Sequence, residues 1–483
     1  MQVQAAALRL AKRKFSSLTS LVFAFFFLAI VLADSRPAVA IPPSSLHLRP
    51  LPAFARKYGM PCSACHEVWP KLSPFGQQFK DNGYQMMNDR DAPIFQQPAY
   101  WPVTFRITPV WHRESANRVG VDNPAGPAGT QMEAQVTTHG FDWTGLDFHT
   151  AGTLAKNVSF YVLPSSDNTG AFHFEAVWAR LDNLLGSSWL NVKFGKFELD
   201  NLLSEKRILT LSSNGGVYQN YHFQPLTENR GFFQFGIGDN QAGVELMGHS
   251  KDDRTRYSVS VLSANDGQPG LPSSRGYNTF VTASQAFQVG KLGLQRVGAF
   301  GYFGQAPTYF QFNQAGAGVP GTGVGNKSFY RAGLIGMWYA NKVDITTMYF
   351  HGWDSAFLGT GTAANTDLPA GAQAPTWNGG LFETHYMFNP QFILINRYEL
   401  IRMSRQALPI APGPFTPGVS VPSGNFGNID SLVVGYRYYP FISSRAGFAF
   451  HNEYALVRQR GAAPVSGADL QSSSVLLGFD FAF

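Results

Sequence analysis

The sequence has little cysteine, little charge and, beyond its first forty residues, no long apolar run. Only two cysteines occur in 483 residues, so no second cysteine pair is present to complete a zinc site. Charged residues make up 14% of the chain, whereas soluble domains carry roughly 25%. No apolar run of about 18 residues or more follows residue 40, which excludes transmembrane helices.

Glycine and aromatic residues are abundant by contrast. The chain contains 49 glycines, and 14% of its residues are aromatic. A chain that is poor in charge and rich in aromatics and glycine, without long apolar runs, is typical of a transmembrane β-barrel. A large secreted array of β-sandwiches is the alternative that this composition leaves open.

The first forty residues have the form of an export signal. The apolar run Leu21–Ala33 follows a positive segment, and Ala38-Val39-Ala40 supplies a small-x-small cleavage site. The apolar run is too short to span a membrane, although an N-terminal anchor is the competing interpretation. The positive segment contains Arg9, Lys12, Arg13 and Lys14.

Removal of this signal changes the charge of the chain. Residues 1–40 contain five basic residues and one acidic residue, so 32 basic and 30 acidic residues remain of the original 37 and 31. The net charge falls from +6 to +2. We therefore expect no nucleic-acid partner.

Several segments alternate between apolar and polar or small residues, as barrel strands do. In "SVLLGFDFAF", the residues from Val475 to Phe483 place apolar side chains on one face and Gly478 and Asp480 on the other. "LVVGYRYY" (432–439) and "VTFRITPVWH" (103–112) follow the same rule. We expect the apolar face to contact lipid.

Polar loops rich in glycine and proline divide the second half of the chain at regular intervals. Their centres lie about 48–50 residues apart, and short breaks fall between them, as in barrels with long outer loops and short periplasmic turns. This spacing predicts about eight hairpins, or about sixteen antiparallel strands, over residues 99–483. The loops are 307–327, 359–376, 405–428 and 461–468.

The two cysteines occur in "MPCSACH", where Cys62 and Cys65 are followed directly by His66. Cys-x-x-Cys is compatible with a redox disulfide, half of a zinc site or covalent haem attachment, and Cys-x-x-Cys-His is the haem c signature. A thioredoxin-type motif belongs to an alternating strand–helix pattern, which the flanking sequence lacks. We therefore predict one covalently attached haem c, with His66 as the ligand of the haem iron.

The segment 41–98 between signal and barrel is expected to form a small α-helical haem c domain. A short helix is predicted after His66, broken at Pro70 and Pro74, and a second from Phe75 to about Asn82, stopped by Gly83. Fewer than sixty residues make a marginal core. We therefore expect this domain to lean on the barrel, at the periplasmic side or in the lumen.

The sixth iron ligand is less determined by the sequence. A methionine thioether raises the reduction potential of a haem and a second histidine lowers it. Met86 and Met87 follow the predicted turn at Gly83 and have enough chain to return over the ring, so both are candidates. Packing on the haem edge is the alternative role for each methionine. His47, His112 and an open iron are further alternatives, and Met60 is too close to Cys62 to reach the distal face.

The segment "FARKYGMPCSACHEVWPKLSPFGQQFKDNGYQ", after a signal and before a barrel ending in Phe483, closely resembles the fused monohaem cytochrome–porins of iron-oxidising bacteria. The likeness is sharpest over residues 52–92. It implies an outer-membrane oxidoreductase of a Gram-negative bacterium that takes electrons from extracellular Fe(II). The electrons would pass through one haem c to a periplasmic cytochrome c. The attachment residues of the family correspond to Cys62, Cys65 and His66.

Two other functions remain open from the sequence. One is a diffusion porin whose haem domain is a plug. The other is an electron conduit that runs outward to an external acceptor. Outer-sphere electron transfer needs no acid, base or nucleophile, which suits the absence of any hydrolytic constellation in the sequence.

Overall fold

The computed structural model describes residues 54, 58, 60–68, 71–84, 103–166, 169–199, 240–263, 277–307, 310–312, 318–320, 326–360, 362, 367–389, 391–408, 428–442 and 447–482. All of these belong to one compact unit, Arg49–Phe483. Within these ranges, no helix is both long enough and apolar enough to cross a membrane.

The segment that carries the cysteine motif consists of four short elements. They are α3 (Cys62–Cys65), β1 (His66–Val68), β2 (Lys71–Leu72) and α4 (Pro74–Asp81). The helix predicted directly after His66 is wrong, because His66 pairs with Leu72 and Val68 with Lys71 in an antiparallel ladder. Proline disfavours helical geometry in the residue before it, and Pro70 therefore stops any helix that would start at His66.

The second predicted helix is confirmed as α4. Pro74 occupies its first turn and Ser73 is its N-cap, with the Ser73 hydroxyl accepting from the amide of Gly76. Gly83 follows the helix with φ of +77°, a conformation that glycine adopts without strain. The sequence thus defines both ends of α4.

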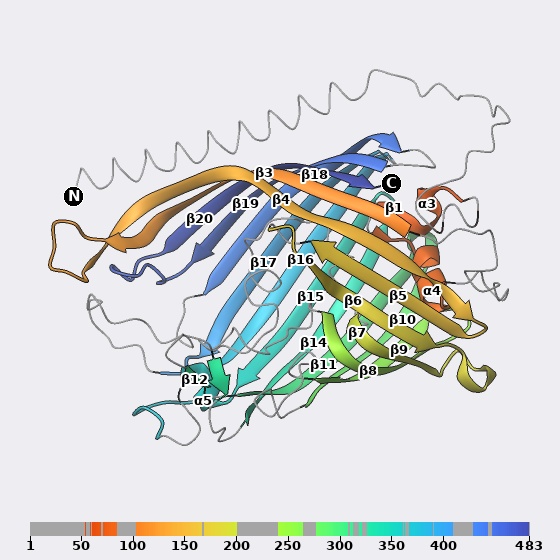
Figure 1. Cartoon of the computed structure of the whole chain (residues 1–483), viewed down its shortest axis with the longest axis horizontal. Helices are drawn as coiled ribbons and strands as arrows, with labels where there is room; N and C mark the ends of the chain where they lie inside the picture. The colour runs from red at the N-terminus through yellow and green to blue at the C-terminus, as the bar shows by residue number, and fades with distance from the viewer. Residues whose placement is uncertain are drawn as a thin grey trace. The chain divides into compact units, whose positions relative to one another are not determined.

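Sixteen strands of the described chain close into one barrel, as the loop spacing predicted (Figure 1). Each strand pairs antiparallel with both neighbours. The first and last strands pair with each other and close the wall. The strands are β3 (Val103–Asp122), β4 (Gln131–Ala155), β5 (Val158–Ser166), β6 (Phe172–Leu181), β7 (Asn191–Glu198), β8 (Asn240–His249), β9 (Thr255–Ser263), β10 (Tyr277–Val289), β11 (Gly293–Pro307), β14 (Asn326–Ala340), β15 (Val343–Asp354), β16 (Thr376–Asn389), β17 (Phe392–Arg405), β18 (Ile429–Ile442), β19 (Gly447–Gln459) and β20 (Leu470–Ala482).

Long and short connections alternate along the second half of the barrel, as predicted. The four glycine- and proline-rich loops each join two strands, and β14–β15, β16–β17 and β18–β19 are joined by short turns. Further small elements lie in connections: β12 (Phe310–Phe312), β13 (Gly318–Pro320), α5 (Ala356–Thr360) and the 3₁₀ turns η1 (Leu184–Gly186) and η3 (Gly290–Leu292). The two ends of the barrel therefore differ, and are named here the long-loop end and the short-turn end.

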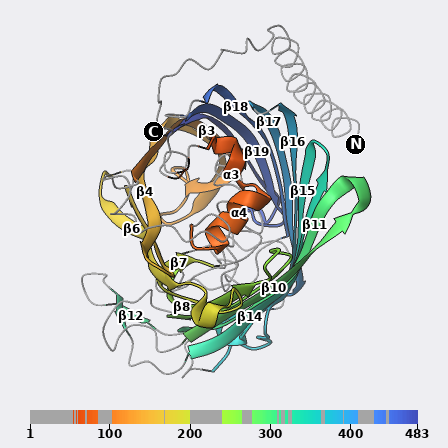
Figure 2. The ribbon, with the colours of Figure 1, turned by 90° about the vertical axis from the view of Figure 1, so that its right-hand side faces the viewer.

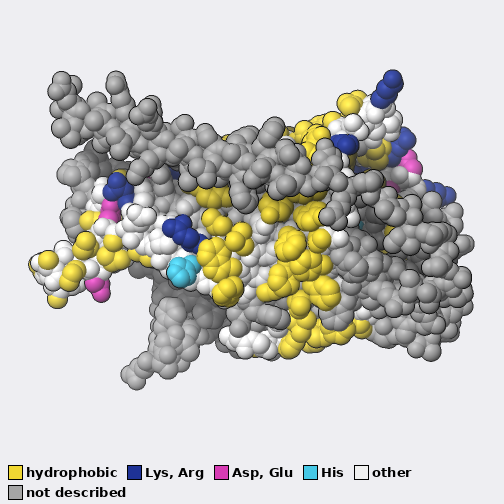
Figure 3. All heavy atoms as spheres, turned by 90° about the horizontal axis from the view of Figure 1, so that it is seen from above, with side chains coloured by type: hydrophobic (Ala, Val, Ile, Leu, Met, Phe, Trp, Pro, Cys, Tyr) yellow, Lys and Arg dark blue, Asp and Glu magenta, His cyan; other side chains and the backbone are white. Residues whose placement is uncertain are grey.

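The alternating residues separate into an outer and an inner face. In β20, Leu477 is 49% exposed on the outside while Asp480 is 3% exposed on the inside. In β18, Leu432 and Tyr438 are exposed and Arg437 is buried. Figure 3 shows apolar side chains gathered on one outer face of the wall. Apolar residues outside and polar residues inside are the pattern of a barrel that faces lipid.

The first strand follows its predicted pattern up to a break. Thr104 and Thr108 are buried, and Arg106 forms ion pairs with Asp147 (3.4 Å) and Asp480 (3.3 Å). The register shifts between Ile107 and Pro109, because proline cannot donate a ladder hydrogen bond.

Candidate functional site

The cysteine motif is a single helical turn fastened to the start of α4. The amide of Ser73 donates to the carbonyl of Cys65 (2.9 Å), and its hydroxyl donates to the carbonyl of Ala64 (3.1 Å). The same hydroxyl accepts from the amide of Gly76. One residue therefore both caps α4 and holds the turn that contains Cys62 and Cys65.

Gly76 allows α4 to approach the motif closely. A Cβ atom at this position would lie 2.0 Å from the carbonyl oxygen of Cys65 and 2.8 Å from its carbonyl carbon. Both are backbone atoms, so a side chain here would force the turn away from the helix. The spacing of motif and helix depends on this glycine.

The structure places Cys65 and His66 half-buried, at the junction of α3 and β1. Positions 62 and 65 are three residues apart in one helical turn, which brings them to the same side of the turn. Met60 lies two residues before α3 and is half-buried. Met86, Met87 and His47 lie outside the described residues, and their candidacy remains a prediction.

An aromatic cluster links α4 to the barrel wall. Phe54 packs edge-on against Phe79 of α4 and stacks on Tyr84, with both pairs of ring centroids 5.0 Å apart. Tyr84 stacks in turn on Trp178 of β6 at 6.1 Å. Tyr58 donates its hydroxyl to the carbonyl of Tyr84 (3.1 Å). Aromatic contacts of this kind bury large apolar areas, and they give the short segment a shared core with the wall.

The last turn of α4 is held by buried charges. The Nη2 atom of Arg256 in β9 lies 2.7 Å from Oδ2 of Asp81, and both side chains are less than a tenth exposed. Gln77 donates to the other Asp81 oxygen (2.9 Å). Arg180 of β6 donates to the carbonyl of Lys80 (2.9 Å) and to Oδ1 of Asp182 (2.6 Å). Figure 2, seen along the barrel, shows α4 inside the ring of strands.

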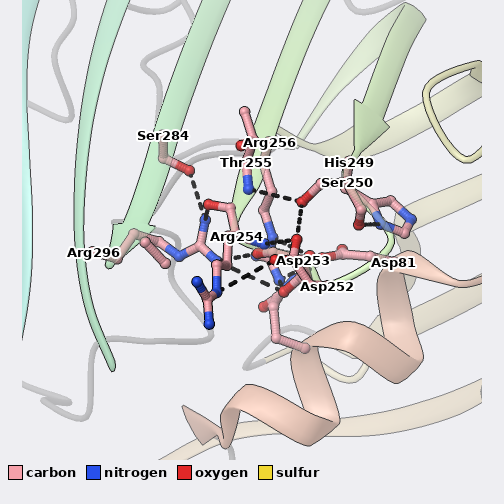
Figure 4. Close-up of polar contacts among 12 residues, drawn as sticks. Asp81, His249, Ser250, Asp252, Asp253, Arg254, Thr255, Arg256, Ser284 and Arg296 are labelled. Carbon is pink, nitrogen blue, oxygen red and sulfur yellow. Dashed lines mark hydrogen bonds and ion pairs between the residues drawn. The ribbon is translucent and has the colours of Figure 1, made fainter. Parts of the chain in front are cut away.

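A second carboxylate, on the turn between β8 and β9, completes this network (Figure 4). Arg256 donates from Nε to Asp253 (2.7 Å) as well as pairing with Asp81. Arg296 of β11 lies 3.7 Å from the Asp253 carboxylate and donates to Ser284 (3.0 Å). Two arginines thus neutralise two carboxylates away from bulk water, as buried charges require.

The two carboxylates respond to this environment in opposite directions. Burial by itself would raise the pKa of Asp81, but the positive charges of Arg256, His249, Lys80 and Arg180 outweigh it and lower that pKa. Burial, followed by the negative charge of Asp81, raises the pKa of Asp253 above its ordinary value. As the pH falls, Asp253 therefore takes up a proton before Asp81 does.

The anchors of α4 lie at the short-turn end of the barrel. Asp182 begins the connection between β6 and β7, and Asp253 lies in the connection between β8 and β9. Gly83 lies beside Asp182, since a Cβ atom on it would be 2.8 Å from Oδ2 of that residue. The contacts of α4 therefore place it at this end of the lumen.

Charged pairs also line other parts of the barrel interior. Arg331 and Asp354 are fully buried and 2.9 Å apart, and Arg437 donates from Nε to Nδ1 of His451 (3.0 Å). In the described part of the chain, no group of three or more ligating side chains is arranged to hold a metal ion. His112, a possible distal ligand, pairs through Nδ1 with Asp142.

The residues that seat α4 could not be identified from the sequence. Ser73, Asp81, Arg180 and Arg256 are ordinary residues in local context, and the last two lie about 100 and 175 positions further along the chain than the helix they contact. The one local signal is Ser73 before Pro74, which predicts a helix start. Long-range pairing of charges leaves no such local pattern.

Neither a protein-family model nor a curated protein matches the sequence. Several solved barrels are similar in structure. A loop L8 deletion mutant of OmpT, an outer membrane protein of Vibrio cholerae, is 10% identical, with coverage of 79% of this chain and 99% of that one and a TM-score of 0.43. The outer membrane channel DcaP of Acinetobacter baumannii is 12% identical, with 81% and 100% covered and a TM-score of 0.43. An anion-selective porin from Comamonas acidovorans is 12% identical, with 79% and 99% covered and a TM-score of 0.46.

Proposed function

We propose that this protein is an outer-membrane c-type cytochrome that oxidises extracellular Fe(II) and passes the electrons to a periplasmic cytochrome c. The closed barrel with exposed apolar side chains on its outer face supports a place in the outer membrane of a Gram-negative cell, against lipid. The export signal expected from residues 1–40 is consistent with this location.

The residues of the motif fit haem c. Positions 62 and 65 share one helical turn, His66 follows directly, and Cys65 and His66 are half-buried rather than enclosed in an apolar core. Cys62 and Cys65 would hold the porphyrin covalently, and His66 would ligate its iron. Met86 and Met87 are the proposed alternatives for the distal position. When bound, the haem supplies reversible one-electron chemistry.

The electron balance of the proposed reaction is simple. Each Fe(II) loses one electron and becomes Fe(III), and that electron reduces one molecule of periplasmic cytochrome c. No proton or leaving group is transferred. The protein's own task is to hold the motif in a fixed place, and Ser73, Gly76 and the Asp81–Arg256 pair do this.

One observation carries the proposal: the helix attached to the haem motif is anchored inside a closed barrel by buried charges. Buried charges are costly unless they are paired. The Asp81–Arg256–Asp253 network pairs a charge on α4 with charges on the barrel wall, and this pairing would be lost if the segment moved freely. A motif fixed in the lumen suits electron transfer across a membrane. Fe(II) as the donor rests on the resemblance of residues 52–92 to cytochrome–porins.

Mass spectrometry of the mature protein tests the haem assignment. We expect the peptide that contains Cys62 and Cys65 to carry the mass of one haem, and Cys65→Ser to abolish attachment through the second thioether. A peptide with two unmodified thiols, or with a disulfide between them, would refute the proposal.

A diffusion porin with a plug is the second candidate, favoured by the barrel alone. Barrels of about sixteen strands are wide enough for an aqueous channel, and such a protein would conduct ions in planar bilayers. The proposed cytochrome should pass little current, because α4 and its aromatic cluster lie in the lumen. The reduction potential of the haem distinguishes the proposed iron oxidase from an electron conduit that runs outward to an external acceptor. Only a haem of high potential accepts electrons from Fe(II).

A further inference from the structure

Four turns at the short-turn end each present an exposed lysine. These lysines lie in the connections β4–β5, β8–β9, β10–β11 and β14–β15, and we call them the basic arc: Lys156, Lys251, Lys291 and Lys342. The last three lie on successive turns around the rim, because β8, β9, β10, β11, β14 and β15 are consecutive in the wall.

The basic arc carries uncompensated charge. None of its lysines forms an ion pair with a described carboxylate, and Lys342 donates only to the backbone carbonyl of Phe388 (3.0 Å). Asp252, on the same turn as Lys251, pairs with Arg254 at 3.3 Å, so these two charges cancel.

The long-loop end is different. There, Arg118 pairs with Glu133 (2.9 Å) and Arg460 with Asp430 (3.3 Å), while Arg458 pairs with Asp469. These three basic side chains are neutralised within the molecule, whereas the exposed Arg405, at the end of β17, forms no ion pair with a described carboxylate. Among the described residues, the four lysines thus add positive charge to the short-turn end of a chain whose expected net charge, after the signal, is close to zero.

Two exposed apolar side chains lie on turns of the same rim. Leu185, in the turn between the connections of Lys156 and Lys251, is 95% exposed, and Leu292, next to Lys291, is 51% exposed. Small apolar contacts set within charged residues are suited to brief association between proteins. Charge of one sign raises the rate of encounter with a partner of the opposite sign.

The same sector of the rim holds the motif. Arg180, Asp182, Asp253, Arg256 and Arg296, which anchor α4 or its network, lie in or beside the connections β6–β7, β8–β9 and β10–β11. Helix α4 has eight residues, which corresponds to about 12 Å at 1.5 Å per residue. The motif at its other end therefore lies about one helix length from the anchors in these connections.

We propose that the basic arc, with Leu185 and Leu292, is the docking surface for a soluble electron carrier with an acidic face. This inference rests on the proposed function, because it takes the short-turn end as the exit for electrons. The carrier would gain one electron and leave, and an interface made of four lysines and two leucines suits that short residence.

The test compares two fourfold variants of the mature, full-length protein. In one, the four lysines become glutamate (Lys156→Glu, Lys251→Glu, Lys291→Glu and Lys342→Glu). In the other, all four become arginine, which preserves the charge. Binding of an acidic soluble cytochrome c to immobilised protein in neutral detergent is measured over a range of salt concentrations, with a basic soluble cytochrome c as the control probe.

We expect the glutamate variant to bind the acidic cytochrome at least about tenfold more weakly at low salt, with little salt dependence left. The arginine variant should bind like the wild type, and the basic cytochrome should bind the wild type poorly. Equal binding by wild type and glutamate variant, or preference of the wild type for the basic cytochrome, would overturn the proposal.

Two further readouts separate the explanations. Binding does not require a functional haem, so loss of Fe(II)-driven reduction with intact binding would count against the proposed function and leave the docking surface standing. Binding is also repeated in phosphatidylcholine nanodiscs, whose headgroups carry no net charge, and there we expect the affinity found in detergent. Abolished binding in these nanodiscs would show that lipid headgroups cover the lysines, and would overturn the proposal.

Discussion

The barrel wall and the α3–α4 segment are stabilised in different ways. In the wall, each strand pairs with the wall strands that precede and follow it in the sequence, and β3 closes the ring on β20. The outer face of the wall needs only apolar side chains. The segment has few residues and depends on contacts with side chains far along the chain, such as Trp178 and Arg256. The stability of the wall is therefore spread over many strand pairs, whereas the attachment of the α3–α4 segment to the wall depends on a few residues.

The largest expected effect comes from Asp81→Ala, which removes the ion pair between α4 and Arg256 and leaves the strand pairing of the wall unchanged. Removing one partner of a buried ion pair costs about 3–5 kcal/mol. We expect a loss at the lower end of this range, because Arg256 still pairs with Asp253. Protease should then release the motif segment rapidly while the barrel keeps its folded mobility on gels. The control is Asp469→Ala, whose half-exposed pair with Arg458 should contribute less than about 1 kcal/mol.

Unchanged protease resistance of the segment in Asp81→Ala would mean that the aromatic cluster alone holds it.

The next effect concerns the junction of motif and helix. Gly76→Ala brings a methyl group against the Cys65 backbone and should cost about 1–3 kcal/mol. We expect incomplete haem attachment, measured as the ratio of haem to protein by absorbance. Gly447→Ala is the matched control, since a Cβ there meets nothing within 4 Å. Equal haem content in both variants would contradict the close approach of Gly76.

A smaller effect is expected for Ser73→Ala. The substitution removes the N-cap of α4 and the hydroxyl bond to Ala64, at a cost of about 1 kcal/mol. Ser73→Thr keeps the hydroxyl and should restore most of the loss. The measurement is the temperature at which the haem spectrum changes, and a shift of similar size in both variants would rule out the capping role.

The last prediction concerns the pH dependence of the contacts that Asp81 makes with the wall. It has no effect at neutral pH, but it distinguishes the α3–α4 segment from the wall by titration. Because the pKa of Asp81 is lowered, its stabilisation is complete above the ordinary value of 3.8 and is lost only as the pH falls through the lower folded value. The raised pKa of Asp253 acts in the opposite sense, since its protonation removes repulsion with Asp81.

Protease release of the segment should therefore stay slow down to about pH 4 and accelerate below it. Asp81→Asn should remove this acceleration. Fast release of the wild-type segment already near pH 6 would contradict the assigned roles of the two carboxylates.

Much of the wall could be predicted from local patterns, because alternation and loop composition are read residue by residue. The faces of "SVLLGFDFAF" and "LVVGYRYY" and the number of strands follow from such patterns. The helix expected after His66 failed, since the proline-bounded stretch from His66 to Leu72 forms a ladder instead. The anchors of α4 could not be found, because pairing between Asp81 and Arg256 depends on the closed barrel bringing distant residues together.

Anaerobic addition of Fe(II) to the purified, oxidised protein tests the central proposal most directly. The haem absorbance should change to that of the reduced form, and oxidised periplasmic cytochrome c added afterwards should be reduced with one electron per Fe(II) consumed. A haem spectrum that does not change on adding Fe(II), in protein shown to carry the haem on Cys62 and Cys65, would contradict the assignment of this barrel as an iron-oxidising cytochrome.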